Sequence, residues 1–141
     1  MKNCLLAMFI SSFTSICFSQ IQFEEISINC LNLSNVAGHI IIKNNAEYEK
    51  LYSYLSPHSE CESYALPSIN FTQEILIGLK VEASGCERPQ WKLKLNKQGG
   101  GCGIDLYIPS TGMCKKLFTE LVWILVKNSD CPKIHNKTAQ K

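Results

Sequence analysis

The sequence is poor in the residues that enzyme chemistry requires. It holds three histidines and lacks the Gly-x-Ser-x-Gly, His-Glu-x-x-His and papain-like cysteine motifs. His39 falls in an apolar stretch, His58 in a polar loop and His135 near the C-terminus, so nothing in the sequence brings two of them together. Catalysis needs a reactive group beside a partner. We therefore predict no catalytic residue and no enzyme activity.

Arginine is also scarce, which argues against nucleic-acid binding. Arg88 is the single arginine, and removal of Lys2 with a leader leaves 13 basic against 12 acidic residues. Phosphate and base recognition rely on clustered arginine with aromatics. The glycines of 99–103 lack the Gly-Lys-Ser/Thr ending of a phosphate loop and are interpreted as a turn. We expect no nucleic-acid partner and no cofactor.

No hydrophobic run is long enough to span a membrane. Residues 1–19 have a basic start, an apolar stretch broken by serine and threonine, and a small residue at Ser19. A spanning helix needs about 20 apolar residues. We predict a signal peptide cleaved between Ser19 and Gln20, and an exported protein that is periplasmic, at the cell surface or secreted. Lipidation of Cys17 is a minor alternative, because no small residue directly precedes it.

Cysteine, in contrast, is abundant. Two of the eight cysteines leave with the leader, and the other six are Cys30, Cys61, Cys86, Cys102, Cys114 and Cys131. An even number of cysteines in an exported chain predicts disulfides, here three. No two of these cysteines lie two to four residues apart and no histidine pair has ligand spacing, so zinc or another metal site is not expected.

Hydrophobic periodicity predicts a mostly β domain with one helix. Strands are expected over 21–28, 36–43, 74–83, 90–97, 102–109 and 120–127. The helix is expected to begin at Asn44–Asn45 and to bury a stripe at Tyr48, Leu51, Tyr52 and Leu55. The domains are then a signal peptide over 1–19, one disulfide-bonded β-rich domain over 20–128, and a loose polar tail over 129–141.

The last strand and the short glycine-bearing connections suggest an arrangement. Residues 121–126 have no polar position, which predicts a central strand with the helix on its second face. The fold class is therefore α+β, mostly β, with an antiparallel meander sheet in a small sandwich or half-barrel, one packed helix and disulfide staples.

A meander also constrains the disulfides. Successive strands alternate in direction, so Cys86 and Cys114 share one end of the sheet and are predicted to pair. Cys86 and Cys102 would be separated by a strand length of about 20 Å, beyond the roughly 7 Å limit between Cα atoms. Two possibilities stay open for the rest: Cys102–Cys131 with Cys30–Cys61, or Cys61–Cys102 with Cys30–Cys131.

Three stretches carry a resemblance to a known family: Asn44-Asn-Ala-Glu-Tyr-Glu-Lys-Leu-Tyr52, Leu66-Pro-Ser-Ile-Asn-Phe-Thr-Gln-Glu-Ile-Leu-Ile-Gly78 with Gly85-Cys86, and Leu121-Val-Trp-Ile-Leu-Val-Lys127. In this order they resemble the PrcB-like family of exported bacterial domains, named for an accessory subunit of a secreted protease complex. The resemblance spans residues 36–127 and implies an accessory role without a catalytic residue. Family members often have Asp at the position of Asn70 and need fewer cysteines.

The function expected from the sequence is a non-catalytic binding or accessory module for another exported protein, such as a protease. The alternative is a small secreted enzyme or an enzyme inhibitor that uses an exposed disulfide loop, 84–89 or 110–116. A carrier of a small ligand on the sheet is a third possibility. Converging His, Asp, Glu or Ser in a pocket would favour the enzyme, and an exposed apolar patch would favour the binder.

Overall fold

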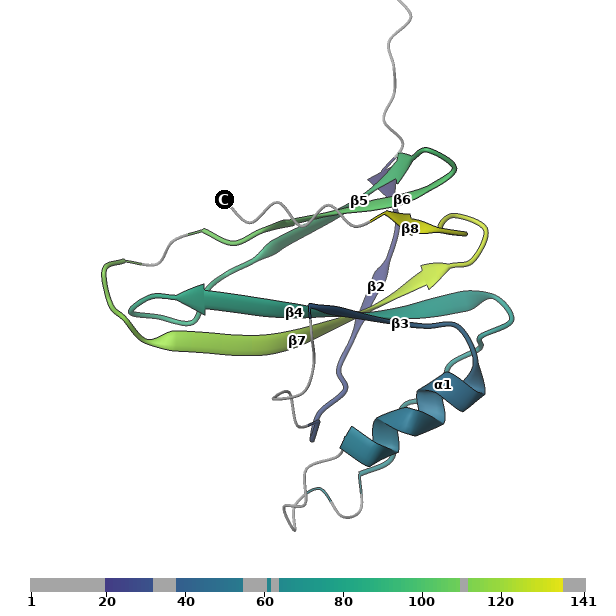
Figure 1. Cartoon of the computed structure of the whole chain (residues 1–141), viewed down its shortest axis with the longest axis horizontal. Coiled ribbons are helices and arrows are strands. Elements are labelled where there is room, and N and C mark those ends of the chain that lie inside the picture. Colours follow the sequence, from purple (N-terminus) through teal and green to yellow (C-terminus); the bar gives the residue numbers. More distant parts are fainter. Residues whose placement is uncertain (1–19, 32–37, 55–60, 62–63, 110–111, 136–141) are drawn as a thin grey trace, which may run out of the picture.

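The computed structural model describes residues 20–31, 38–54, 61, 64–109 and 112–135. The predicted signal peptide, 1–19, and residues 136–141 of the predicted tail lie outside this part of the chain. The described residues form three layers: a sheet of order β1-β5-β6-β8, a second sheet of order β2-β7-β4-β3, and a short helix on the outer face of the second sheet (Figure 1). The predicted class, a mostly β sandwich with one packed helix and disulfides, is confirmed.

The strand bounds follow the predicted runs closely. The first predicted strand is split into β1 (Gln20–Ile21) and β2 (Glu24–Ile26), so the chain passes from one sheet to the other. The remaining elements are β3 (His39–Ile42), β4 (Glu74–Ser84), β5 (Lys92–Gln98), β6 (Gly101–Tyr107), β7 (Leu117–Lys127) and β8 (Ile134–His135).

The predicted meander is wrong in its pairing. β4 pairs along its whole length with β7, from Glu74↔Lys127 to Ser84↔Leu117, and the β5–β6 hairpin belongs to the other sheet. The reason is that β4 and β7 are apolar on both faces and need a cover on each. β5 is apolar on one face and carries lysines on the other, so the hairpin packs over β4 and β7 instead of extending their sheet.

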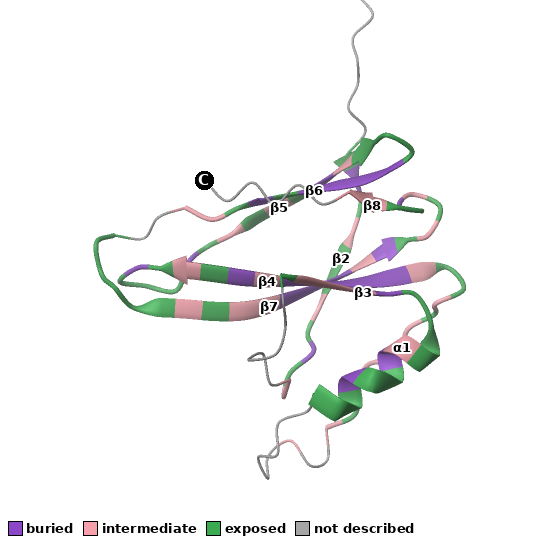
Figure 2. Ribbon diagram, viewed as in Figure 1, coloured by how far each residue is buried: buried purple, intermediate pink, exposed green. Residues whose placement is uncertain are grey.

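Two apolar clusters hold the layers together (Figure 2). Between the sheets, Ile77, Val81 and Ile124 pack against Leu95 and Cys102. On the other face, Leu76 and Trp123 pack against Tyr48 and Leu51 of the helical segment. β7 thus lies between β2 and β4 and is covered by the helix, as its wholly apolar stretch predicted.

The helix begins as expected and then tightens. Asn44 accepts a hydrogen bond from the backbone N–H of Glu47 at 2.9 Å, and the Glu47 carboxylate accepts one at 2.8 Å from the N–H of Lys43, the residue before the cap. The α-helix α1 spans Asn45–Glu49 and continues as the 3₁₀ helix η2, Lys50–Tyr54.

This tightening changes which side chains face the core. Tyr48 and Leu51 are buried, but Tyr52 is 50% exposed, so the predicted stripe is wrong at that position. A 3₁₀ turn has three residues, which aligns positions three apart and rotates the fourth away. Leu55 lies outside the described residues.

The predicted tail is not loose over its first part. β8 pairs in parallel with β6, Cys102↔Ile134 and Gly103↔His135, and Cys131 is 1% exposed. The expectation of a loose tail from residue 129 is therefore wrong for 129–135, because a disulfide and a strand pairing fix this segment to the first sheet.

Candidate binding site

The six cysteines form three disulfides, Cys30–Cys61, Cys86–Cys114 and Cys102–Cys131, with Cα–Cα distances of 5.5, 4.8 and 5.2 Å. The predicted pair Cys86–Cys114 is present although the meander is wrong. The prediction depended on strand direction, which still alternates from β4 to β7, and not on which strands are neighbours. The sequence leaves two pairings open for the other four cysteines, and the structure has Cys102–Cys131 with Cys30–Cys61.

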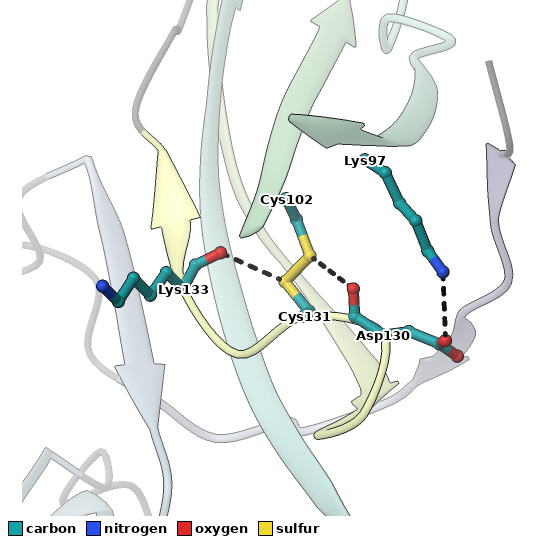
Figure 3. Close-up of a disulfide and its surroundings, with 5 residues drawn as sticks. All are labelled: Lys97, Cys102, Asp130, Cys131 and Lys133. Carbon is teal, nitrogen blue, oxygen red and sulfur yellow. Dashed lines mark hydrogen bonds and ion pairs between the residues drawn. A yellow bond between two sulfur atoms is a disulfide. The ribbon is translucent and has the colours of Figure 1, made fainter. Parts of the chain in front are cut away.

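Cys102–Cys131 lies deepest and joins β6 to the segment after β7 (Figure 3). Its two sulfur atoms lie 3.6 Å from the carbonyl oxygen of Asp130 and 3.8 Å from that of Lys133. Lys97 and Asp130 form an ion pair at 3.8 Å above it. Cys102 and Cys131 are buried inside the sandwich, the ion pair lies at its surface, and Cys86–Cys114, in contrast, is exposed.

The histidines are not brought together. His39 is on β3 and His135 on β8, in different sheets, and His58 lies outside the described residues. The imidazole Nε2 of His135 is buried without a hydrogen-bond partner in the described part of the chain. Asp105 accepts a hydrogen bond from the Asn96 side chain at 2.6 Å on the exposed face of the hairpin. In the described ranges, no three His, Cys, Asp or Glu side chains are placed to share a metal ion.

A pocket of about 410 Å³ lies beside the N-terminal half of β7. It opens where the chain after β2 diverges from β7: β2 pairs with β7 at Ile26↔Trp123 and no further. One wall is the segment 27–31, the other is 119–123 of β7, and Arg88 and Trp91 close the end. The volume is within the range of sites for small ligands and peptide side chains.

Trp123 shapes the inner wall of this pocket. A Cβ atom on Gly78, its cross-strand partner, would lie 2.6 to 2.9 Å from the six-membered ring, so the indole occupies the space that the glycine leaves. That edge of the ring lies against β4. The Nε1 atom is buried and has no acceptor among the described residues. A buried donor without an acceptor is uncommon and calls for an explanation.

An ion pair between Arg88 and Glu120 lies at the mouth of the pocket. The Arg88 guanidinium donates to Glu120 through Nε at 2.5 Å and Nη2 at 2.8 Å, a two-pronged contact. The hydrogen bonds to Glu120 raise the pKa of Arg88. The Arg88 side chain is 75% exposed and Glu120 20%, so the pair presents its cation to solvent at the pocket mouth. No protein-family model, curated protein or solved structure matches the chain.

Sequence reasoning missed this site. The predicted strand began at residue 120, whereas β7 begins at Leu117. Residues 117–120 alternate exposed and half-buried, and from Val122 inward the strand is almost wholly covered. This change from alternating to continuous burial marks the point where β2 ends and the pocket begins. The wall that includes Arg88 and Trp91 comes from a loop that no local pattern places there.

Proposed function

We propose that this protein is an exported, non-catalytic module that binds another exported protein at the end of the sandwich that carries Cys86–Cys114. The observation that carries the proposal is the pocket beside β7, which has Trp91 and Trp123 among its lining residues and lies toward the end of the sandwich that carries several exposed apolar side chains. Concave sites of this size that combine aromatic and polar side chains are common binding sites of proteins.

Exposed large hydrophobic side chains gather at this end. Among the described residues there are five such side chains, and Tyr107, Met113 and Leu117 lie here, with exposed fractions of 57, 98 and 67%. Tyr107 ends β6, and Met113 and Leu117 lie on either side of the last turn before β7. Several exposed apolar side chains at one end of the sandwich favour a protein-binding surface there.

Export is the second part of the proposal. Three disulfides form and persist in an oxidising compartment, and none of the helices in the described ranges is long and apolar enough to cross a membrane. The stretches that resemble PrcB-like domains fall on α1, on the segment entering β4 and on β7. An accessory role beside a secreted protease is what that resemblance supports.

The test is site-specific photo-crosslinking of the full chain in the cells that export it. A photoreactive phenylalanine analogue at Leu117 should give a crosslink to one exported protein. The same analogue at Tyr52, which is comparably exposed on η2 over the other half of the second sheet's outer face, should not. Purified partner and module should then form a stoichiometric complex in calorimetry. Equal crosslinking at both positions, or none at either, would contradict the proposal.

One observation favours an inhibitor as the second candidate. Met113 is 98% exposed and adjoins Cys114, so the disulfide to Cys86 holds this tip of the chain outward. A rigid, tethered loop loses little entropy when it enters an active-site cleft. Titration of the protein against a panel of secreted proteases distinguishes the two candidates. Inhibition that Met113→Asp abolishes would favour the inhibitor, and binding without inhibition would favour the accessory module.

A further inference from the structure

In the part of the chain that the structure describes, no strand pairs with the outer edge of β7 from Leu117 to Leu121. Gly85 N–H donates to the carbonyl of Lys116 at 3.0 Å, and at the other end Asn128 N–H donates to Gln73 at 2.8 Å. In an antiparallel pair, hydrogen-bonded residues alternate. The even-numbered residues of β7 therefore bond to β4, and the odd-numbered ones direct their N–H and C=O groups to the opposite edge.

β2 pairs with one part of the β7 edge and leaves the other part without a neighbouring strand. Trp123 and Leu125 are registered with Ile26 and Glu24 of β2. Leu117, Thr119 and Leu121 have no strand on that side in the described part of the chain. An exposed row of such groups is a template for a further strand. Glu120 and the two lysines before Leu117 limit uncontrolled pairing, because charges on an edge oppose aggregation.

The pocket limits what can bind at the β7 edge, because a second wall faces that edge. Its far wall, 27–31, contains the buried Ile28 and is held by the Cys30–Cys61 disulfide. A space of about 410 Å³ between that wall and β7 accommodates a few residues of a single extended chain. The edge of a second copy of this domain would carry its own sheet and meet this wall. A partner's peptide is therefore the occupant that fits.

The position of β2 indicates the direction in which a bound peptide would run and the charge that its end should carry. A strand that continues the line of β2 runs antiparallel to β7, so its C-terminal end reaches Leu117. Lys115 and Lys116 lie there, both exposed and without an ion pair in the described ranges, and Lys116 Nζ lies 4.9 Å from the centre of the Phe118 ring. The exposed Arg88 guanidinium is at the same end. Acidic residues, or a terminal carboxylate, complement this end.

We propose that the outer edge of β7 binds an extended partner peptide as an added antiparallel strand. Its backbone pairs with Leu117, Thr119 and Leu121, and its acidic C-terminal end lies beside Lys115 and Lys116. Apolar side chains at alternate positions would face Leu121 and Trp123, since successive residues of a strand point to opposite faces. This binding mode rests on the proposed protein-binding function and specifies its ligand.

The test uses a library of random peptides of about seven residues with free carboxyl termini, a length that spans five strand positions with a margin. The library is enriched on the immobilised, disulfide-intact protein. Enriched peptides should alternate apolar residues and end in Asp or Glu. They should change the emission of Trp91 and Trp123, the two tryptophans of the chain, both in the pocket wall.

The decisive variant is Thr119→Pro. The Thr119 N–H points to the free edge, so proline there removes a donor to the peptide and none to β4, and proline is tolerated on an edge with this orientation. Loss of that bond and the steric effect of the ring should weaken peptide binding by about tenfold or more, whereas Thr119→Ala, which keeps the N–H, should bind within about threefold of wild type. Lys115→Glu with Lys116→Glu should remove the preference for acidic ends.

Hydrogen exchange completes the test. Bound peptide should slow exchange at Leu117, Thr119 and Leu121, and leave Phe118 and Glu120 unchanged. Failure to enrich any peptide, equal binding to Thr119→Pro, or protection elsewhere would overturn the edge mode. The two proposals fail separately: a crosslinked partner that binds Thr119→Pro as tightly as wild type contradicts the edge mode alone, and absence of any partner contradicts the function.

Discussion

The two halves of the β4–β7 pair differ both in their residues and in their neighbours: 74–79 and 122–127 are apolar except at their outer ends, whereas 80–84 and 117–121 include Lys80, Glu82 and Glu120. In the closed half, 74–79 with 122–127, β3 and β2 flank the pair and the helical segment covers it. In the open half, 80–84 with 117–121, the outer face and the β7 edge are exposed. Leu76 is 0% and Leu117 is 67% exposed although both are leucines on the same face. A long strand pair can thus supply a core at one end and an open edge at the other.

The disulfides should show the largest energetic contrast. Cys102–Cys131 and Cys86–Cys114 close loops of similar size, with separations of 29 and 28 residues, so loop entropy assigns about 3 to 4 kcal/mol to each. Cys102 and Cys131 are also buried. Replacing both with Ala should cost about 5 kcal/mol, against about 3 to 4 kcal/mol for the Cys86 and Cys114 pair, because buried contacts are lost too.

Urea unfolding followed by circular dichroism measures both losses. The variant without Cys102–Cys131 is expected to lie near the limit of stability for a domain of this size. Equal losses for the two double variants would show that the sulfur atoms in the core contribute no more than those at the open end.

Leucine truncation is the next contrast. Leu76→Ala should destabilise by about 3 kcal/mol, because it removes a fully buried side chain between the sheet and the helix. Leu117→Ala should change stability by less than about 0.5 kcal/mol, since its side chain is largely in solvent. Thermal and urea unfolding midpoints measure both effects. A loss of stability for Leu117→Ala comparable to that for Leu76→Ala would mean that Leu117 is buried and that this half of the pair is covered.

The titration of Tyr48 tests whether the helical segment buries its side chain against the closed half of the sheet. Burial, with smaller contributions from Tyr64 and Tyr52, raises the pKa of Tyr48 from 10.0 to about 12, and its hydroxyl donates to the Pro67 carbonyl at 2.7 Å. The folded state therefore retains the proton more tightly than the unfolded state. This contribution is complete below pH 10 and is lost as the pH rises to about 12, an effect of about 2 to 3 kcal/mol.

Tyr48→Phe should abolish that part of the alkaline loss, and the exposed Tyr52→Phe should keep it. Stability measured between pH 9 and 12 for the three proteins gives the difference. Identical pH profiles for wild type and Tyr48→Phe would contradict the burial of the hydroxyl under the helix.

The smallest effect is expected at the pocket mouth. Arg88→Gln breaks the contact with Glu120, but the guanidinium is in solvent, and exposed ion pairs contribute little. The unfolding midpoint should not change measurably. Glu120→Gln is the matched variant that removes the carboxylate charge, and a clear loss of stability for Arg88→Gln would place the pair within the folding core.

The sequence allowed the strands, the helix cap and one disulfide to be predicted, since each depends on local chemistry or strand direction. Asn44 before Glu47, and the uninterrupted apolar run ending at Val126, are examples. The sheet order depends on which faces of the strands are covered. The lysines on one face of β5 indicate that this face is exposed and that only the other can pack against β4 and β7. The pocket was not predictable, because the divergence of β2 after Ile26 and the position of Arg88 depend on tertiary packing.

Native-state hydrogen exchange on the free protein tests the open edge of β7 most directly. The account predicts an alternating pattern in the open half: fast exchange at the amides of Leu117, Thr119 and Leu121, and slow exchange at Phe118 and Glu120, which bond to β4. The amides of Trp123 and Leu125, paired with β2, should be protected. Uniform protection from Leu117 to Leu125 would show that the edge is already occupied, and uniformly fast exchange over 117–121 would show that this half of β7 is not paired with β4.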